Sequence, residues 1–164
     1  MSRESPPGTG THNPPGRPVR KPGRRVADLR LGRDSPAVPA FEEFTATLEF
    51  LSSGERSVLT IAGDEVIENL ITHGEVGPAG IAVRVRKAPD RLILSVLVES
   101  HSRFADFAGE VASGELPGPR YNTELRRWHG LGLTMCRNLA SRVSYRAGEL
   151  TDRVILEFTL SPRP

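Results

Sequence analysis

The chain has 164 residues, 37% of them hydrophobic, and a formal net charge of +2 at pH 7, which indicates one folded domain of a water-soluble protein. No apolar run approaches membrane-spanning length and no apolar segment near the start predicts a secretory signal, so we expect a cytoplasmic protein with no membrane contact. The single cysteine, Cys136, excludes an internal disulfide and is most simply a small core residue.

Residues 1–39 differ in composition from the rest of the chain. They hold eight of its 14 prolines and carry a net charge of +5, whereas the whole chain carries +2. Such a segment cannot bury enough apolar surface to offset the entropy lost on folding, so we expect a disordered basic tail before one domain over residues 40–162. Its arginines form either a solvated charge run or a weak contact for nucleic acid or an acidic partner. Residues 26–31 are the one stretch of the tail that could add an edge strand.

Helices and strands alternate in blocks after the tail. Apolar side chains recur at helical spacing over residues 41–51, and a second helix is expected over residues 55–73, ended by Gly74. Residues 81–85 and 92–98 read as strands. The short turn between these strands predicts an antiparallel pair, with an outer and a more buried member.

The second half of the chain predicts a long loop, a helix and another hairpin. Residues 105–127 are rich in glycine and proline, as in functional or mobile loops, although an ordinary surface loop has the same composition. A helix follows from Gly132, and residues 143–147 and 153–160 read as paired strands. We therefore predict an α+β fold, a two-layer sandwich in which helices cover one face of a mixed, mostly antiparallel sheet.

Residues 64–74, DEVIENLITHG, are the most informative segment of the chain. On a helix, Glu65, Asn69 and His73 lie four residues apart and form one polar stripe beside an apolar face. A carboxylate, an amide and an imidazole at the margin of a core need partners, and each costs about 1–3 kcal/mol without one. A bound ligand is one such partner. The alternatives are a surface carboxylate, a helix-end amide and a histidine that caps the helix.

A second candidate site precedes the third expected helix, in the segment WHGLGL that begins at Trp128. Glycines at the start of a helix let the backbone approach an anion, which the free N–H groups and the helix dipole attract. Gly130 and Gly132 are therefore candidates for binding phosphate. The alternative is that these glycines only allow a tight turn into the helix.

Together the two segments resemble the motifs of the GHKL ATPases, the superfamily with the Bergerat fold, and most closely those of its anti-sigma factors with serine-kinase activity. That branch carries Glu-x-x-x-Asn-x-x-x-His on its first motif helix, as do Glu65, Asn69 and His73 here. Its last motif reads Gly-x-Gly-Leu-x-Leu or similar, and Gly130, Gly132 and Leu133 fit it. The order of the motifs also agrees, and the resemblance covers roughly residues 40–160.

The resemblance implies an ATP-binding regulator of bacterial transcription that acts by partner switching. Its expected partners are a sigma factor or the antagonist of an anti-sigma factor, and a homodimer is one expected assembly. Glu65 would be the catalytic base for a serine hydroxyl of the partner, and Asn69 would hold Mg²⁺ on the phosphates. The loop over residues 105–127 would be the lid over ATP. The nucleotide-binding residues that the resemblance implies are Asn69, His73, Glu99, Gly130, Gly132 and Leu133.

The family's middle motif, Asp-x-Gly-x-Gly-Phe, is altered in this chain to ESHSRF at residues 99–104. In the family the aspartate recognises the adenine amino group, and the glycines leave room for the base. Glu99 can still accept a hydrogen bond but is one methylene longer, and His101 and Arg103 add bulk. The chain is therefore either an ATP-dependent serine/threonine protein kinase or a degenerate GHKL domain that has lost nucleotide and acts as a protein-binding module.

Overall fold

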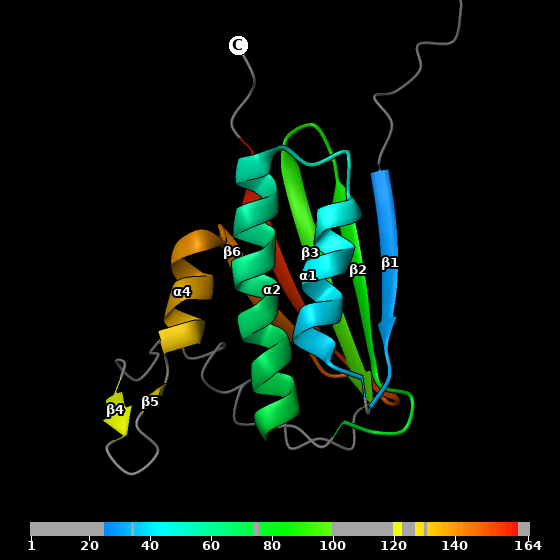
Figure 1. Ribbon diagram of the computed structural model, residues 1–164, viewed down its shortest axis with the longest axis vertical. Coiled ribbons are helices and arrows are strands. Elements are labelled where there is room, and N and C mark those ends of the chain that lie inside the picture. The colour runs from blue at the N-terminus through cyan, green and yellow to red at the C-terminus, as the bar shows by residue number, and fades with distance from the viewer. Residues whose placement is uncertain are drawn as a thin grey trace, which may run out of the picture.

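The computed structural model describes residues 25–33, 35–73, 76–99, 120–122, 127–129 and 131–160. In this part of the chain the fold is α+β, and three helices lie on one side of a five-stranded sheet (Figure 1). The elements in chain order are β1 (Arg25–Leu31), α1 (Ala37–Thr47), α2 (Ser53–His73), β2 (Ile81–Lys87), β3 (Arg91–Glu99), β4 (Arg120–Asn122), β5 (Arg127–His129), α4 (Leu131–Leu139), β6 (Arg142–Arg146) and β7 (Thr151–Thr159).

The large sheet has the strand order β1-β2-β3-β7-β6, and each neighbouring pair is antiparallel. In the register, Leu94 of β3 pairs with Val85 on one side and with Leu156 on the other. Both predicted hairpins, β2 with β3 and β6 with β7, are confirmed, as is the two-layer α+β fold. The predicted outer strand, β2, instead lies inside the sheet, because β1 adds a further strand at its edge.

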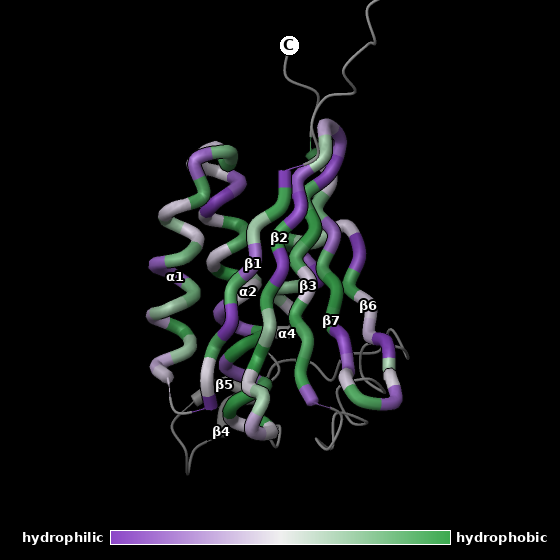
Figure 2. The backbone as a smooth tube through the Cα atoms, turned by 90° about the vertical axis from the view of Figure 1, so that its right-hand side faces the viewer, coloured by the Kyte–Doolittle hydropathy of each residue, from purple (hydrophilic) through white to green (hydrophobic). Residues whose placement is uncertain are grey.

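In the large sheet, buried and more exposed positions alternate along β2, β3 and β7, so that one face forms the core on the side of the helices. No described helix lies over the other, outer face (Figure 2). The core positions of β3 are at most 2% exposed, whereas its outward positions include Ile93 and Leu97, which are half-buried. This alternation follows from the period of two along a strand. The core side chains of β3 are Leu92, Leu94, Val96 and Val98.

The start of α2 is fixed by reciprocal hydrogen bonds that the sequence motif SSGE supplies. The backbone N–H of Glu55 donates to Ser52 Oγ at 3.3 Å, and the backbone N–H of Ser52 donates to Glu55 Oε2 at 2.7 Å, which is a capping box. Lys87 Nζ, at the end of β2, donates to the same Glu55 oxygen at 2.6 Å. Burial favours the neutral acid, but these hydrogen bonds hold the pKa of Glu55 below its ordinary value. One end of α2 is thereby tied to the sheet.

Close packing at Gly63 holds α1 against the middle of α2. A Cβ atom at Gly63 would overlap the ring of Phe41, which is completely buried. Thr45 of α1 and Thr60 of α2 share a hydrogen bond of 2.8 Å between their hydroxyls. These contacts fix the side of α2 that α1 covers, and therefore the part of the helix that stays open.

The folded part begins earlier in the chain than the composition predicts. β1 pairs with β2 along seven residues and Leu31 is 2% exposed, so the edge-strand alternative for residues 26–31 is confirmed. The predicted tail boundary near residue 39 is too late, because α1 also starts before it, at Ala37. The disorder of residues 1–24, which lie outside the described residues, stays a prediction. Within the predicted long loop lies β4, which pairs with β5 at the end of that loop in a short antiparallel ribbon.

Two truncated chains distinguish the contribution of the tail to stability from that of the edge strand β1. We expect a chain that begins at Arg25 to melt within a few degrees of the full chain, because residues 1–24 offer few apolar side chains to pack. A chain that begins at Ala37 loses the whole β1 ladder and the buried Leu31, and its melting temperature should fall by more than about 10 °C. Circular dichroism melts measure both values. Equal melting temperatures for the two truncated chains would show that β1 contributes nothing to stability.

Candidate functional site at the contact of α2 with α4

The predicted polar stripe lies on α2 at the margin of the core. Val66 and Leu70, which border it, are at most 1% exposed, and Glu65 and Asn69 are half-buried. His73 is the last residue of α2, and its side chain lies outside the described part of the chain. Two of the three predicted polar groups are therefore at a boundary between core and solvent, where a ligand can reach them.

The packing of α4 on α2 brings Gly132 against the side chain of Glu65. The Cys136 thiol, completely buried on α4, donates to the carbonyl oxygen of Ala62 on α2 at 3.4 Å. One turn earlier on α4, a Cβ atom at Gly132 would overlap Glu65 Oε2. The carboxylate therefore occupies space that only a glycine leaves free. Residues of the first and last predicted motifs, far apart in sequence, are adjacent here.

The need for glycine at position 132 is a need for space. Among the described glycines only Gly80 has a positive φ, at 72°, so the turn at Gly132 does not require the left-handed conformation. Gly130 and the side chain of Leu133 lie outside the described residues, and their predicted phosphate contacts stay predictions. Glycine at 132 is explained by the approach of Glu65, a contact that packs α2 against α4.

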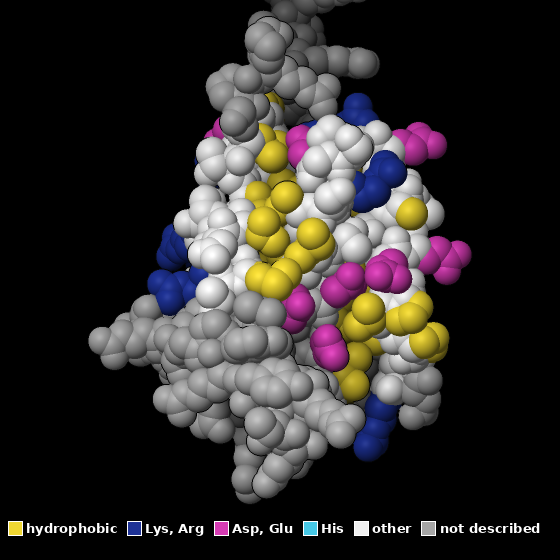
Figure 3. Space-filling view, turned by 60° about the vertical axis from the view of Figure 1, so that its left-hand side comes forward, with side chains coloured by type: hydrophobic (Ala, Val, Ile, Leu, Met, Phe, Trp, Pro, Cys, Tyr) yellow, Lys and Arg dark blue, Asp and Glu magenta, His cyan; other side chains and the backbone are white. Residues whose placement is uncertain are grey.

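Three carboxylates on α1 and α2, those of Glu42, Glu65 and Glu68, create an acidic environment around Asp64. Burial, followed by repulsion from Glu42, Glu65 and Glu68, raises the pKa of Asp64 to about 6. Burial and Glu68 likewise raise the pKa of Glu65 above its ordinary value. Figure 3 shows acidic side chains gathered beside hydrophobic ones on this side of the molecule. The sequence motifs do not single out Asp64, because its environment depends on how α1 packs against α2.

Burial near these carboxylates affects both Asp64 and the Cys136 thiol, in different ways. Asp64 Oδ1 is buried and has no hydrogen-bond partner among the described residues, so its carboxylate lacks compensation. Burial and the nearby Glu65 raise the pKa of Cys136 to about 12, which keeps the thiol protonated and unreactive at neutral pH. Cys136 is thus a core residue, as expected from the sequence.

Glu99 lies against a different segment from Glu65. It is the last residue of β3, and a Cβ atom at Gly77, in the segment between α2 and β2, would overlap Glu99 Oε2. Along β3, Glu99 alternates in phase with Ile93 and Leu97 rather than with the core residues. Its Oε2 atom is buried and has no hydrogen-bond partner among the described residues. His101 and Arg103 lie outside that part of the chain, so the described residues do not join Glu99 to the pair of Glu65 and Gly132.

The residues that are brought together fit a magnesium-bound phosphate better than a bare one. A triphosphate alone would be repelled by the carboxylates of Asp64, Glu65 and Glu68, whereas Mg²⁺ offsets that charge. No group of three His, Cys, Asp or Glu side chains suited to a metal ion occurs among the described residues. A cation would therefore depend on the Asn69 amide oxygen, on phosphate oxygens and on water, which is the usual way in which Mg²⁺ is held.

Replacing Asp64 tests the electrostatics of the site. Because folding raises the pKa of Asp64 from 3.8 to about 6, the unfolded chain loses its proton first, and stability falls as pH rises through this window. Asp64→Asn should therefore stabilise the protein at pH 7, by about 1 kcal/mol after allowance for solvent screening, and should flatten the profile between pH 4 and pH 6. Urea unfolding at several pH values measures this, with Glu43→Gln on α1 as an exposed control. A lower stability of Asp64→Asn at pH 7 would contradict the stated environment.

A double-mutant cycle tests the contact between the helices. In Gly132→Ala the new methyl group must push the Glu65 carboxylate aside, and because that group ends a flexible side chain we expect a loss of only about 1 kcal/mol. In a Glu65→Ala background the loss should vanish, because alanine is itself favoured over glycine in a helix. Gly54→Ala on α2, where an added Cβ meets nothing within 4 Å, is the matched control. Additive effects of Gly132→Ala and Glu65→Ala would show that the two residues do not touch in solution.

Comparisons with known proteins support the fold. No family model matches the chain, and no curated protein matches it in sequence. Among solved structures, it is similar to the crystal structure of the RsbU and RsbW domains of Rv1364c from Mycobacterium tuberculosis, with a TM-score of 0.53 and 14% sequence identity. The match covers 85% of this chain and 34% of that chain, so this chain spans about a third of its length. None of the described helices is long and apolar enough to cross a membrane. The similarity shows a shared fold, in agreement with the architecture expected from the sequence.

Proposed function

We propose that this protein is a regulator of the anti-sigma type that binds Mg-ATP where α2 meets the start of α4, and that it phosphorylates a protein partner. The observation that carries the proposal is the packing of the Glu65 carboxylate against Gly132. It joins a carboxylate suited to proton transfer with a helix start suited to phosphate. The shared fold with a structure that includes an RsbW domain supports the regulatory class.

Glu65 and Asn69 have separate roles in this proposal. The raised pKa of Glu65 makes it a better proton acceptor than an exposed carboxylate, and it takes the proton from a serine or threonine hydroxyl of the partner. Asn69, one turn further along α2, offers a neutral amide oxygen to Mg²⁺. Mg-ATP, when bound, supplies the phosphoryl group. The free N–H groups at the start of α4 would attract the phosphates, and glycine at position 132 lets Glu65 lie directly beside this helix start.

The acidic environment makes the proposed binding strictly metal-dependent. Glu42, Asp64 and Glu68 lie close enough to Glu65 or to one another to shift pKa values, and each repels an uncompensated triphosphate. We therefore expect Mg²⁺ to strengthen ATP binding more than it would at a site lined by lysine or arginine. Protonation of Asp64 near pH 6 would reduce this repulsion.

A second candidate function is a protein-binding module that has the same fold but no nucleotide. It is favoured by the position of Glu99, which packs against Gly77 and not against the pair of Glu65 and Gly132. It is also favoured by His101 and Arg103, which stand where the family has glycines. In this alternative, the Glu65 contact with α4 serves only to pack the two helices.

Nucleotide titration of point variants distinguishes the two functions. With Mg²⁺ present, Asn69→Ala should lose most of the ATP affinity, by about tenfold or more, because the amide places the metal. Glu65→Gln should keep the affinity but lose phosphoryl transfer, because the amide cannot accept the proton. Binding is measured by titration calorimetry, and transfer by incorporation of labelled phosphate into a serine-containing partner. Glu43→Gln, an exposed acid on α1 that shifts the pKa of neither Asp64 nor Glu65, is the matched control and should keep both activities.

Restoring the family's middle motif tests for a gain of ATP binding, where the preceding variants test for a loss. The variant with Glu99→Asp, His101→Gly and Arg103→Gly should bind ATP more tightly if the wild type already binds it. Binding by the restored variant alone, with none by the wild type at millimolar ATP, would favour the module without nucleotide. Tight binding by the wild type that Asn69→Ala leaves unchanged would place the nucleotide elsewhere in the protein.

A further inference from the structure

The outer face of the large sheet, opposite the helices, combines an apolar centre with basic sides. Across β3 and β7 its central positions are Ile93, Ser95, Leu97 and Ile155, which the register places side by side. Ser95 is 3% exposed and Ile155 8%, although no described helix covers them (Figure 2). Arginines lie on the neighbouring strands, and the methylene groups of such long side chains can cover apolar surface while the charge stays in water.

Two arginine rows border this apolar centre. The first row lies on β1 and β2 and consists of Arg30, Arg84 and Arg86; the second lies on β6 and β7 and consists of Arg142, Arg146 and Arg153. Arg84 is paired with Asp28 at 2.6 Å. The other five arginines form no ion pair among the described residues. Acidic side chains on this face are fewer: besides Asp28, they are Glu99 and Glu157.

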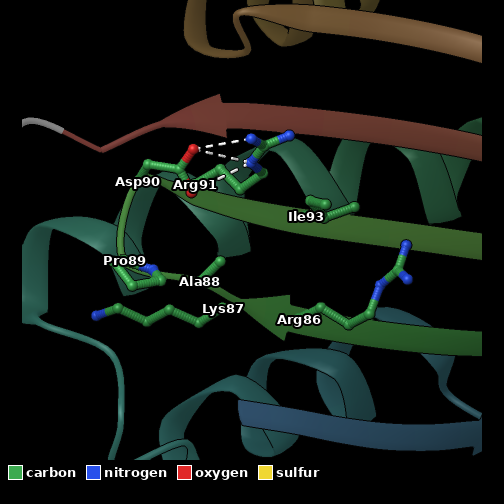
Figure 4. A pocket seen from close by; sticks show the side chains of 7 residues that line it. All are labelled: Arg86, Lys87, Ala88, Pro89, Asp90, Arg91 and Ile93. Atoms are coloured by element: carbon green, nitrogen blue, oxygen red, sulfur yellow. Dashed lines mark hydrogen bonds and ion pairs between the residues drawn. The ribbon is translucent and has the colours of Figure 1, made fainter. Parts of the chain in front are cut away.

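Arg86 is the best-defined candidate of the first row for contact with an anion. It lines a pocket of about 320 Å³ at the turn between β2 and β3, where Ile93 lies beside it and Asp90 is paired with Arg91 (Figure 4). Arg86 Nε is buried and has no hydrogen-bond partner among the described residues. A buried, unpaired guanidinium N–H costs free energy that an incoming carboxylate would recover.

The spacing of the rows fits an α-helix. From β2 to β6 the sheet crosses three strand spacings, or about 14 Å, and a helix with its side chains is about 10–12 Å wide. A helix laid over β3 and β7 would place an apolar stripe on Ile93 and Leu97. Acidic residues on its two flanks would then reach the two arginine rows.

We propose that the outer face binds an acidic amphipathic helix of a partner protein. Charge complementarity selects this occupant, since apolar contacts fill the centre and carboxylates meet the rows. Nucleic acid fits less well, because the centre between the rows is aliphatic and, in the five described strands of the large sheet, the aromatic residues Tyr145 and Phe158 are in phase with the core positions and not with the outer face. A second copy of the same face would bring like charges together. This inference is independent of nucleotide binding at α2.

A synthetic peptide measures the proposed interaction with the full-length protein. The probe is a fluorescein-labelled helical peptide with leucines along one face and glutamates on both flanks, and binding is followed by fluorescence anisotropy. The double reversal of Arg86→Glu and Arg142→Glu should weaken binding by about tenfold or more. Reversal of two exposed arginines off this face, Arg25→Glu with Arg33→Glu, changes the net charge equally and should weaken it by less than about threefold. Melting temperatures confirm that both variants fold.

Three further readouts decide the identity of the occupant. A peptide with the same composition in scrambled order should bind about tenfold more weakly, because it has no apolar stripe. Amide shifts in NMR spectra should change on β2, β3, β7 and β6 and leave α2 unchanged. The proposal is wrong if the peptide does not bind at millimolar concentration or if both double variants bind it equally. It is also wrong if a DNA duplex of equal charge binds more tightly than the peptide, or if the shifts fall on α2.

Discussion

The packing of α2 between the sheet and two other helices is the constraint on which the rest of the structure depends. Its apolar face is completely buried on the sheet, Gly63 receives the ring of Phe41 from α1, and the Ala62 carbonyl accepts the Cys136 thiol from α4. Because both flanks are occupied, only a narrow stripe of α2 remains open. Asp64, Glu65 and Glu68 lie close together on this open part of α2. Their partial burial and mutual repulsion produce the raised pKa values of Asp64 and Glu65.

The same layered arrangement separates charge between the two sides of the molecule. Carboxylates gather over α1 and α2, whereas arginines dominate the outer face of the sheet. A cation-bound anion suits the first side, and an acidic partner suits the second. The two proposed sites are thus on opposite sides of one sheet, so a nucleotide and a partner could be bound together. We therefore expect substitutions at one site to leave the other unchanged.

Helices and strands are predictable from the sequence where apolar spacing and turn residues within one segment specify them. Contacts that depend on how separate segments pack together are not predictable in this way. The β2–β3 and β6–β7 hairpins and the helix α2 are confirmed, since apolar spacing and turn residues specify them directly. β1 is hidden in the composition of the tail, although Ala27, Leu29 and Leu31 alternate as a strand should. The adjacency of Glu65 and Gly132 depends on the docking of α4, which no single segment encodes; only the ordered pair of motifs indicates it. The acidity around Asp64 is not predictable from its own helix, because Glu42 reaches it from α1.

Hydrogen–deuterium exchange with and without Mg-ATP tests most directly whether α2 and α4 form one nucleotide site. The account predicts slower amide exchange at the start of α4 and around Asn69 on α2 when both Mg²⁺ and ATP are present, and little change with ATP alone. The strands of the outer face should be unaffected. Unchanged exchange in α2 and α4 at saturating Mg-ATP, or protection confined to another part of the chain, would contradict the account.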